Sequence, residues 1–104
     1  NCELELAQLT TNDPTKLSLS RIQYSLLCHP KGGIIDEILV YRLKDEFLLV
    51  VNAANTVKDY EWIKSHLKGS AKVEDLTNSI ALIAIQGPES EKIVRELEPI
   101  ADCY

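Results

Sequence analysis

The stretch PKGGIIDEILVY, which runs from Pro30 to Tyr41, decides the predicted fold. A turn with two glycines leads into a strand that places two carboxylates, Asp36 and Glu37, where apolar side chains are expected. Because side chains alternate between the two faces of a strand, each face of this strand carries one acid. A carboxylate in an apolar row must be hydrogen-bonded, face a ligand or lie at a wet edge.

Three strands joined by short turns are predicted around this stretch. They span Arg21–His29, Ile34–Leu43 and Phe47–Asn52, with turns at Pro30–Gly33 and Lys44-Asp45. Alternating apolar side chains favour the strands, and glycine, proline and aspartate favour the turns. The two hairpins in series form an antiparallel meander, and a helix over Cys2–Leu9 precedes it.

The second half of the chain predicts two helices and two more strands. These elements are a helix over Thr56–Lys68, an edge strand over Ala71–Leu76, a buried strand over Ile80–Ile85, and a helix over Pro88–Leu97 that Pro99 ends. The first of these helices has an apolar stripe made of Val57, Tyr60, Ile63 and Leu67, and Thr56 with Asp59 resembles a capping box. The order predicts an α+β fold, an antiparallel or mixed sheet of about five strands with helices packed on one face.

The lengths of the two turns predict which side chains share a face of the meander. They pair Tyr24 with Leu39, Leu26 with Glu37, Tyr41 with Leu48, and Glu37 with Asn52. Paired residues lie on the same face, which then holds Tyr24, Leu26, Glu37, Leu39, Tyr41, Leu48, Val50 and Asn52. An apolar floor with two phenols, one carboxylate and one amide suits a flat heteroaromatic ligand. The alternative is a rim acid at Glu37 beside two core tyrosines whose hydroxyls reach the surface.

The composition narrows the class of protein. The chain has 104 residues, enough for one domain, and a net charge of −5 without a basic patch, which argues against nucleic acid and membranes as partners. Its apolar runs are too short to cross a bilayer, and no signal peptide opens it. The three cysteines, Cys2, Cys28 and Cys103, are too widely spaced for a disulfide framework or a metal site, so a reducing compartment and no metal are expected. The lack of methionine suggests a processed chain or a fragment.

Several segments in order along the chain resemble one known family. They are Leu9–Asp13, Tyr24-Ser25, Gly32–Tyr41, Leu49–Asn55, Lys58-Asp59, Trp62 and Ala81–Pro88. Together they resemble the T-protein of the glycine cleavage system, the tetrahydrofolate-dependent aminomethyltransferase. The resemblance implies that residues 1–104 are a single partial domain, most of one ferredoxin-like half of a folate-binding region, without the C-terminal barrel. Missing neighbouring elements would leave apolar surface exposed, so association of this piece with itself or with the remainder of the protein is expected.

The resemblance also implies roles for residues on the predicted face. The family has an aspartate at the position of Glu37, so Glu37 is the expected catalytic carboxylate, with Asp36 as a second candidate if the register differs. Tyr24, Leu39, Tyr41 and Asn52 match expected folate contacts. Glutamate keeps the charge of aspartate and extends its reach by roughly 1.5 Å, a change large enough to affect catalysis.

The implied reaction is aminomethyl transfer in glycine cleavage. The lipoylated H-protein would be the partner and tetrahydrofolate the acceptor substrate, with ammonia and 5,10-methylenetetrahydrofolate as products. The expected location is the bacterial cytoplasm, or the mitochondrial matrix in a eukaryote. Two alternatives stay open: a folate-binding relative that maintains iron–sulfur clusters or demethylates a substrate, and a non-catalytic ferredoxin-like interaction module.

Overall fold

The structure, a computed structural model, describes residues 2–97 of the chain. The chain divides into two compact units, residues 1–74 and residues 75–104, and each is described by itself. The predicted helix stop at Pro99 and the third cysteine, Cys103, lie outside the described residues. Cys2 and Cys28 are both free thiols.

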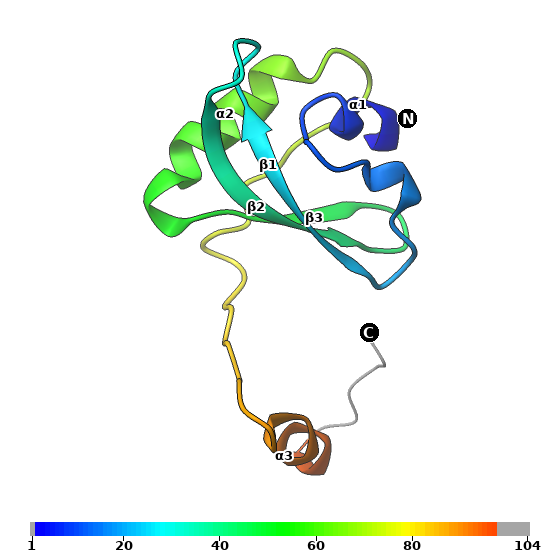
Figure 1. Ribbon diagram of the computed structural model, residues 1–104, viewed down its shortest axis with the longest axis vertical. Coiled ribbons are helices and arrows are strands. Elements are labelled where there is room, and N and C mark those ends of the chain that lie inside the picture. The colour runs from blue at the N-terminus through cyan, green and yellow to red at the C-terminus, as the bar shows by residue number, and fades with distance from the viewer. Residues whose placement is uncertain (1, 98–104) are drawn as a thin grey trace. The chain divides into compact units, whose positions relative to one another are not determined.

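The first unit is a three-stranded antiparallel sheet with two helices (Figure 1). Its elements are α1 (Cys2–Ala7), β1 (Ile22–Cys28), β2 (Ile34–Arg42), β3 (Phe47–Val50) and α2 (Thr56–His66), with short 3-10 turns at Pro14–Lys16 and Ala53–Asn55. The strands follow one another in the order β1-β2-β3, as two consecutive hairpins require. The predicted α+β class and antiparallel meander are confirmed.

The register of both hairpins is the predicted one over most of their length. Leu26 lies opposite Glu37, and Tyr41 lies opposite Leu48. At the first turn a bulge places Cys28, rather than His29, opposite Ile34. The cause is local, because the His29 N–H donates to the carbonyl of Gly33 at 2.7 Å and closes the turn there.

The core lies on one face of the sheet. Leu27, Ile38 and Val40 of the strands are buried together with Leu6 of α1 and Ile63 of α2. Burying an aliphatic side chain of this size contributes roughly 1.5–3 kcal/mol, so this cluster is the main source of stability in the unit. Since α1 and α2 both supply core residues to the same face, the predicted packing of helices on one face is confirmed for these two helices of the first unit.

The short helix α1 depends on contacts with other elements. A six-residue helix is not stable alone in water, because helix nucleation is costly. Its Glu3 pairs with Arg42 at the end of β2. Its Glu5 accepts hydrogen bonds from the backbone N–H groups of Gly69 at 2.8 Å and Ala71 at 3.1 Å. These contacts tie the start of the chain to the strands and to the segment after α2.

Helix α2 faces the sheet with most of the predicted stripe, because Ile63 is buried, Leu67 packs against the core and Tyr60 is half-buried. Val57 differs from the prediction, since it is 76% exposed, and Asp59, four residues before Ile63, is buried in its place. Asn55, rather than Thr56, is the N-cap residue, and its side chain makes no capping hydrogen bond. The capping-box prediction was therefore wrong, because Asp59 points into the protein instead of back to the helix start. Residues four apart share a helix face, so burying Ile63 also buries Asp59.

The second unit has one described helix, α3 (Ser90–Leu97). It begins two residues after the predicted start, where the Ser90 hydroxyl donates to the Gly87 carbonyl at 2.8 Å. None of the helices in residues 2–97 is long and apolar enough to cross a membrane.

The prediction of about five strands is wrong for the described residues, which form three. Residues 71–76 and 80–85 have no regular secondary structure. Four apolar side chains of the second segment are exposed: Ile80 (49%), Leu82 (70%), Ile83 (80%) and Ile85 (56%). A strand forms only where a neighbouring strand satisfies its backbone N–H and C=O groups, and within residues 2–97 neither segment is paired with one.

Candidate functional site

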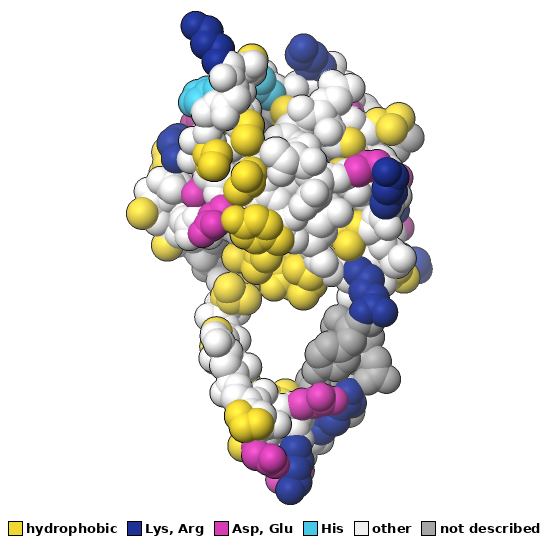
Figure 2. All heavy atoms as spheres, viewed as in Figure 1, with side chains coloured by type: hydrophobic (Ala, Val, Ile, Leu, Met, Phe, Trp, Pro, Cys, Tyr) yellow, Lys and Arg dark blue, Asp and Glu magenta, His cyan; other side chains and the backbone are white. Residues whose placement is uncertain are grey.

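The sheet has an open face opposite its core. We call it the open face and define it by the predicted set Tyr24, Leu26, Glu37, Leu39, Tyr41, Leu48 and Val50, with Asn52 just beyond the end of β3. Each of these residues is exposed or half-buried. Figure 2 shows hydrophobic side chains gathered over the strands, with acidic side chains beside them. The structure therefore brings the strand residues of this set to one surface, while the Asn52 side chain at its edge bonds to Asp36 behind it.

An acid–phenol pair stands on the open face. The Tyr24 hydroxyl, on β1, donates to Glu37 Oε2, on β2, at 2.7 Å. This hydrogen bond raises the pKa of the Tyr24 phenol, because ionisation would place a second negative charge beside Glu37. The bond is a consequence of the hairpin register, which puts Glu37 diagonally across from Tyr24. It fixes the direction of the carboxylate on this surface.

Asp36 lies on the opposite, buried face and is only 6% exposed. Its carboxylate accepts hydrogen bonds from the Asn52 N–H at 3.3 Å, from Asn52 Nδ2 at 2.8 Å and from Asn55 Nδ2 at 3.0 Å. Burial opposes ionisation of Asp36, but the neighbouring Asp59 side chain and the hydrogen bonds from Asn52 and Asn55 outweigh it and lower the pKa of Asp36. The two neighbouring acids of β2 therefore have opposite environments.

Asn52 connects the buried acid to the open face. Its Nδ2 donates to Asp36 and also lies 3.4 Å from the backbone carbonyl of Glu37. The side-chain oxygen of Asn52 takes no part in these two bonds. Because an amide group is planar, bonds at the nitrogen also set the direction of the oxygen.

Asp59 is the functional candidate that sequence reasoning missed. It is fully buried on α2, and burial and the neighbouring Asp36 carboxylate raise its pKa to about 6, against a smaller effect of Lys58. Among the described residues, no hydrogen-bond donor reaches either of its carboxyl oxygens, and Lys58 Nζ is 3.9 Å from Oδ1. Its position four residues before Ile63, on the same helix face, was the available signal.

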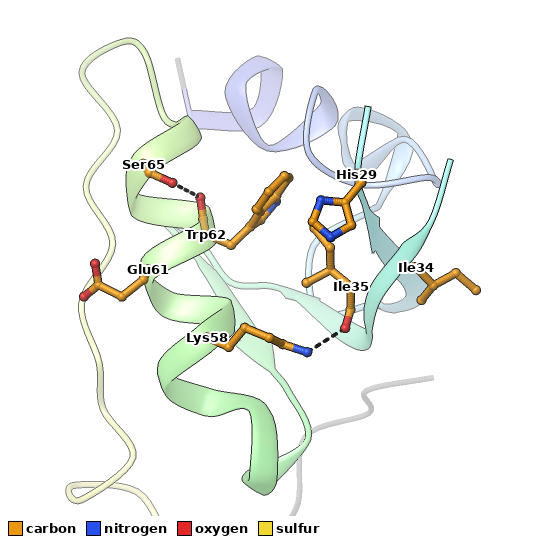
Figure 3. Close-up of a pocket in the computed structure, with 7 residues that line it drawn as sticks. All are labelled: His29, Ile34, Ile35, Lys58, Glu61, Trp62 and Ser65. Atoms are coloured by element: carbon orange, nitrogen blue, oxygen red, sulfur yellow. Dashed lines mark hydrogen bonds between the residues drawn. The ribbon is translucent and has the colours of Figure 1, made fainter. Parts of the chain in front are cut away.

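A shallow pocket of ≈ 460 Å³ lies on the helix side of the first hairpin (Figure 3). Trp62 lines this pocket and contacts two histidines. The His29 ring lies edge-on to the Trp62 ring at 5.0 Å between centroids, and the His66 ring stacks on it at 3.8 Å. Lys58 Nζ donates to the Ile35 carbonyl at 2.8 Å at the lower end, and Glu61 points away from the space. This pocket brings together none of the predicted site residues.

The described residues hold no group of three or more His, Cys, Asp or Glu side chains arranged as a metal site. The site consists instead of apolar and aromatic side chains, one exposed carboxylate and one amide. The fold and this surface place the chain in a class of α+β domains that cover one sheet face with helices and leave the other open.

Comparison with known proteins identifies the family. The GCVT N-terminal domain family matches residues 3–103, and the chain belongs to it. The aminomethyltransferase of Geobacillus thermodenitrificans is 44% identical over 93 residues, which cover 88% of this chain and 26% of that protein. The aminomethyltransferase of Chlorobium limicola is 42% identical over 101 residues, which cover 94% and 28%. The chain thus spans about a quarter of the length of these relatives.

A solved structure supports the same relationship. The crystal structure of glycine cleavage system aminomethyltransferase T from Bartonella henselae superposes with a TM-score of 0.61 at 28% sequence identity. The match covers 65% of this chain and 19% of that one. The resemblance found in the sequence is confirmed.

Proposed function

We propose that the full-length protein is a tetrahydrofolate-dependent aminomethyltransferase of glycine cleavage, and that residues 1–104 are one partial domain of its folate-binding region. Family membership and relatives named aminomethyltransferase support this proposal. The observation that carries it is the Tyr24–Glu37 pair on the open face, with Asn52 beside it. Because the relatives are bacterial, we place the protein in the bacterial cytoplasm.

In the proposed reaction the substrate is an aminomethyl group on the dihydrolipoyl arm of the H-protein. Ammonia leaves, and the one-carbon unit passes to tetrahydrofolate as 5,10-methylenetetrahydrofolate. Positive, iminium-like charge develops on the transferred carbon. A fixed carboxylate on an apolar surface stabilises such charge and orients the attacking amine of the pterin. We assign this role to Glu37, with the Tyr24 hydroxyl holding it in place.

The remaining open-face residues would bind the folate. Leu39 and the two tyrosines, Tyr24 and Tyr41, offer apolar and aromatic surface for the pterin or aryl ring. Asn52 would present its side-chain oxygen to the polar edge of the ring, because its nitrogen is held by Asp36. Asp36 itself is buried away from this surface, so we propose it as a supporting residue rather than as the catalytic carboxylate.

We also propose that the longer protein completes the predicted ferredoxin-like sheet of about five strands. The support is the exposed apolar segment at residues 80–85, which has the composition of a central strand and no partner in the described part of the chain. Residues 1–104 alone are then expected to be inactive, because other parts of the protein would supply the rest of the folate site.

The test is titration of the full-length protein with tetrahydrofolate, followed by an assay of ammonia release from aminomethylated H-protein. Binding together with ammonia release supports the proposal. Binding without ammonia release would identify a folate-binding relative that maintains iron–sulfur clusters or demethylates a substrate. No binding would reject the proposal in favour of a non-catalytic interaction module.

A further inference from the structure

A buried polar cluster lies directly behind the open face. It joins Asp36 of β2, Asp59 of α2, and Asn52 and Asn55 from the segment between β3 and α2. Asp36 is its centre, because it accepts three hydrogen bonds from the two asparagines at 2.8–3.3 Å. Asp36 and Asp59 are 6% and 0% exposed, so the cluster lies inside the first unit.

Burying such a cluster destabilises the fold unless each polar group has a hydrogen-bond partner. A buried carboxylate needs hydrogen bonds or a partner charge, and two ionised carboxylates side by side repel each other. Among the described residues no hydrogen-bond donor faces the oxygens of Asp59, so a protonated Asp59 that donates to Asp36 would satisfy both acids with one shared proton. The pair then carries one negative charge, which the amide groups of Asn52 and Asn55 stabilise.

The cluster reaches the open face through a single side chain. Of the four members, Asn52 is the exposed one, and its Nδ2 lies between Asp36 Oδ1 and the Glu37 carbonyl. With the nitrogen held on the buried side, the amide oxygen has a fixed direction next to Glu37. Apolar residues at 36 and 59 would fill the same space, but they could not hold the amide in this way.

We propose that Asp36 is a positioning residue for the ligand site, which holds the Asn52 amide beside Glu37 and is itself locked by a proton from Asp59. The proposal rests on the proposed function, since the ligand whose binding reports on Asn52 is tetrahydrofolate. Asp36 touches no ligand in this scheme and acts only through Asn52.

A double-mutant cycle on the full-length protein tests this coupling. Asp36→Ala and Asn52→Ala should each weaken tetrahydrofolate binding by about tenfold, the typical value of a hydrogen bond to a charged group. The double variant should bind no more weakly than the weaker single variant, because both changes remove one interaction. Asp45→Ala is the matched control, since it removes the same carboxylate from an exposed turn. Independent effects that multiply in the double variant would overturn the proposal.

The proton on Asp59 has a separate test. Lys58 on α2 and Asp36 on β2 are the charged groups that act on Asp59. Loss of its proton would put two charges side by side and loosen the hold on Asn52. Tetrahydrofolate affinity should therefore fall as the pH rises through about 6, the pKa of Asp59. Asp59→Asn keeps an N–H donor toward Asp36 and should bind several times more tightly than Asp59→Leu, without this pH dependence. Equal affinities, or an unchanged pH profile in Asp59→Asn, would contradict the proposal.

A measurement without ligand separates this inference from the proposed function. The side-chain amide protons of Asn52 and Asn55, observed by NMR, should show hydrogen-bonded shifts that Asp36→Ala removes and Asp45→Ala leaves. If the wild-type protein does not bind tetrahydrofolate, the proposed function and the ligand part of this inference fail together. If it binds and the Asn52 amide signal is the same in Asp36→Ala, the inference alone fails. The NMR comparison also applies to Asp59→Leu, should Asp36→Ala not fold.

Discussion

At Glu37 a single substitution can distinguish the effect of the negative charge from the effect of side-chain size. Glu37→Gln keeps the size of the side chain and an oxygen that accepts the Tyr24 hydroxyl, but it removes the negative charge. If the charge acts in the transition state, turnover should fall by roughly 100-fold while tetrahydrofolate affinity changes far less. The measurements are the rate of ammonia release and the dissociation constant for tetrahydrofolate.

Glu46→Gln is the matched control for this experiment, because Glu46 is an exposed acid in the turn between β2 and β3. It should leave the rate of ammonia release and the dissociation constant for tetrahydrofolate unchanged. Wild-type turnover in Glu37→Gln would remove Glu37 from the mechanism, and an equal loss of binding and turnover would assign it to ligand binding alone.

Asp59 should make the stability of the protein depend on pH. Its pKa in the folded state is about 6, above the ordinary value of 3.8, so the folded state holds this proton more tightly than the unfolded state. The resulting stabilisation is complete below pH 3.8 and is lost as the pH rises through 6. It amounts to on the order of 3 kcal/mol. Asp36 has a lowered pKa and is ionised in both states across most of this range, so it does not cancel the effect.

The check is chemical denaturation between pH 4 and pH 7. The free energy of unfolding should decrease with pH for the wild type and for Asp45→Asn, and it should vary much less for Asp59→Asn. Identical slopes for the wild type and Asp59→Asn would show that Asp59 is ionised in the folded protein throughout this range.

At the scale of single elements, the turn before β2 depends on one glycine. Gly32 has φ of +87°, in a region that L-residues with a Cβ rarely occupy, and a Cβ there would meet no other atom within 4 Å. Gly32→Ala should therefore cost about 1–2 kcal/mol through backbone strain alone. Gly33→Ala is the matched control, because Gly33 has ordinary φ and its Cβ would make only a normal 3.8 Å contact with His29. Equal melting temperatures for the two variants would refute this explanation of the turn.

The three strands and their register could be predicted because both follow from local rules. Alternation along β2 and the lengths of two turns suffice to place Glu37 opposite Leu26 and to separate it from Asp36. The rotation of α2 could not be predicted in the same way. Val57 is apolar and Asp59 is an acid, yet Asp59 is the buried one, and its protonation depends on Asp36, which lies on a different element.

Part of the candidate site could be predicted from local rules and part could not. The strand residues of the open face follow from the alternation of side chains and from strand pairing, and the structure brings them together. The hydrogen bond from Tyr24 to Glu37 follows from that register. The bond from Asn52 to Asp36 joins the segment after β3 to the buried face of β2, and no local pattern specifies it. The segment at residues 80–85 reads as a central strand, but strand formation needs a neighbouring strand, and the sequence of one segment does not contain its partner.

At the scale of the whole molecule, the second unit exposes several large apolar side chains. Besides the segment at residues 80–85, α3 leaves Ile93 and Leu97 52% and 75% exposed. Exposed apolar side chains gathered in this way favour association, because burial removes them from water. Residues 1–104 by themselves should therefore self-associate, and the average mass in sedimentation experiments should rise with protein concentration.

Ile83→Lys should weaken this association, because it places a charge in the centre of the exposed apolar segment, at a side chain that is 80% exposed. Val57→Lys is the matched control: Val57 is similarly exposed, at 76%, but it lies on α2 in the first unit. At high concentration the wild type and Val57→Lys should have the same average mass, and Ile83→Lys should have a lower one. A wild-type piece that remains monomeric at every concentration would show that this surface does not drive association. In the full-length protein the same substitution should instead lower stability, because we propose that the segment is covered there by a neighbouring strand.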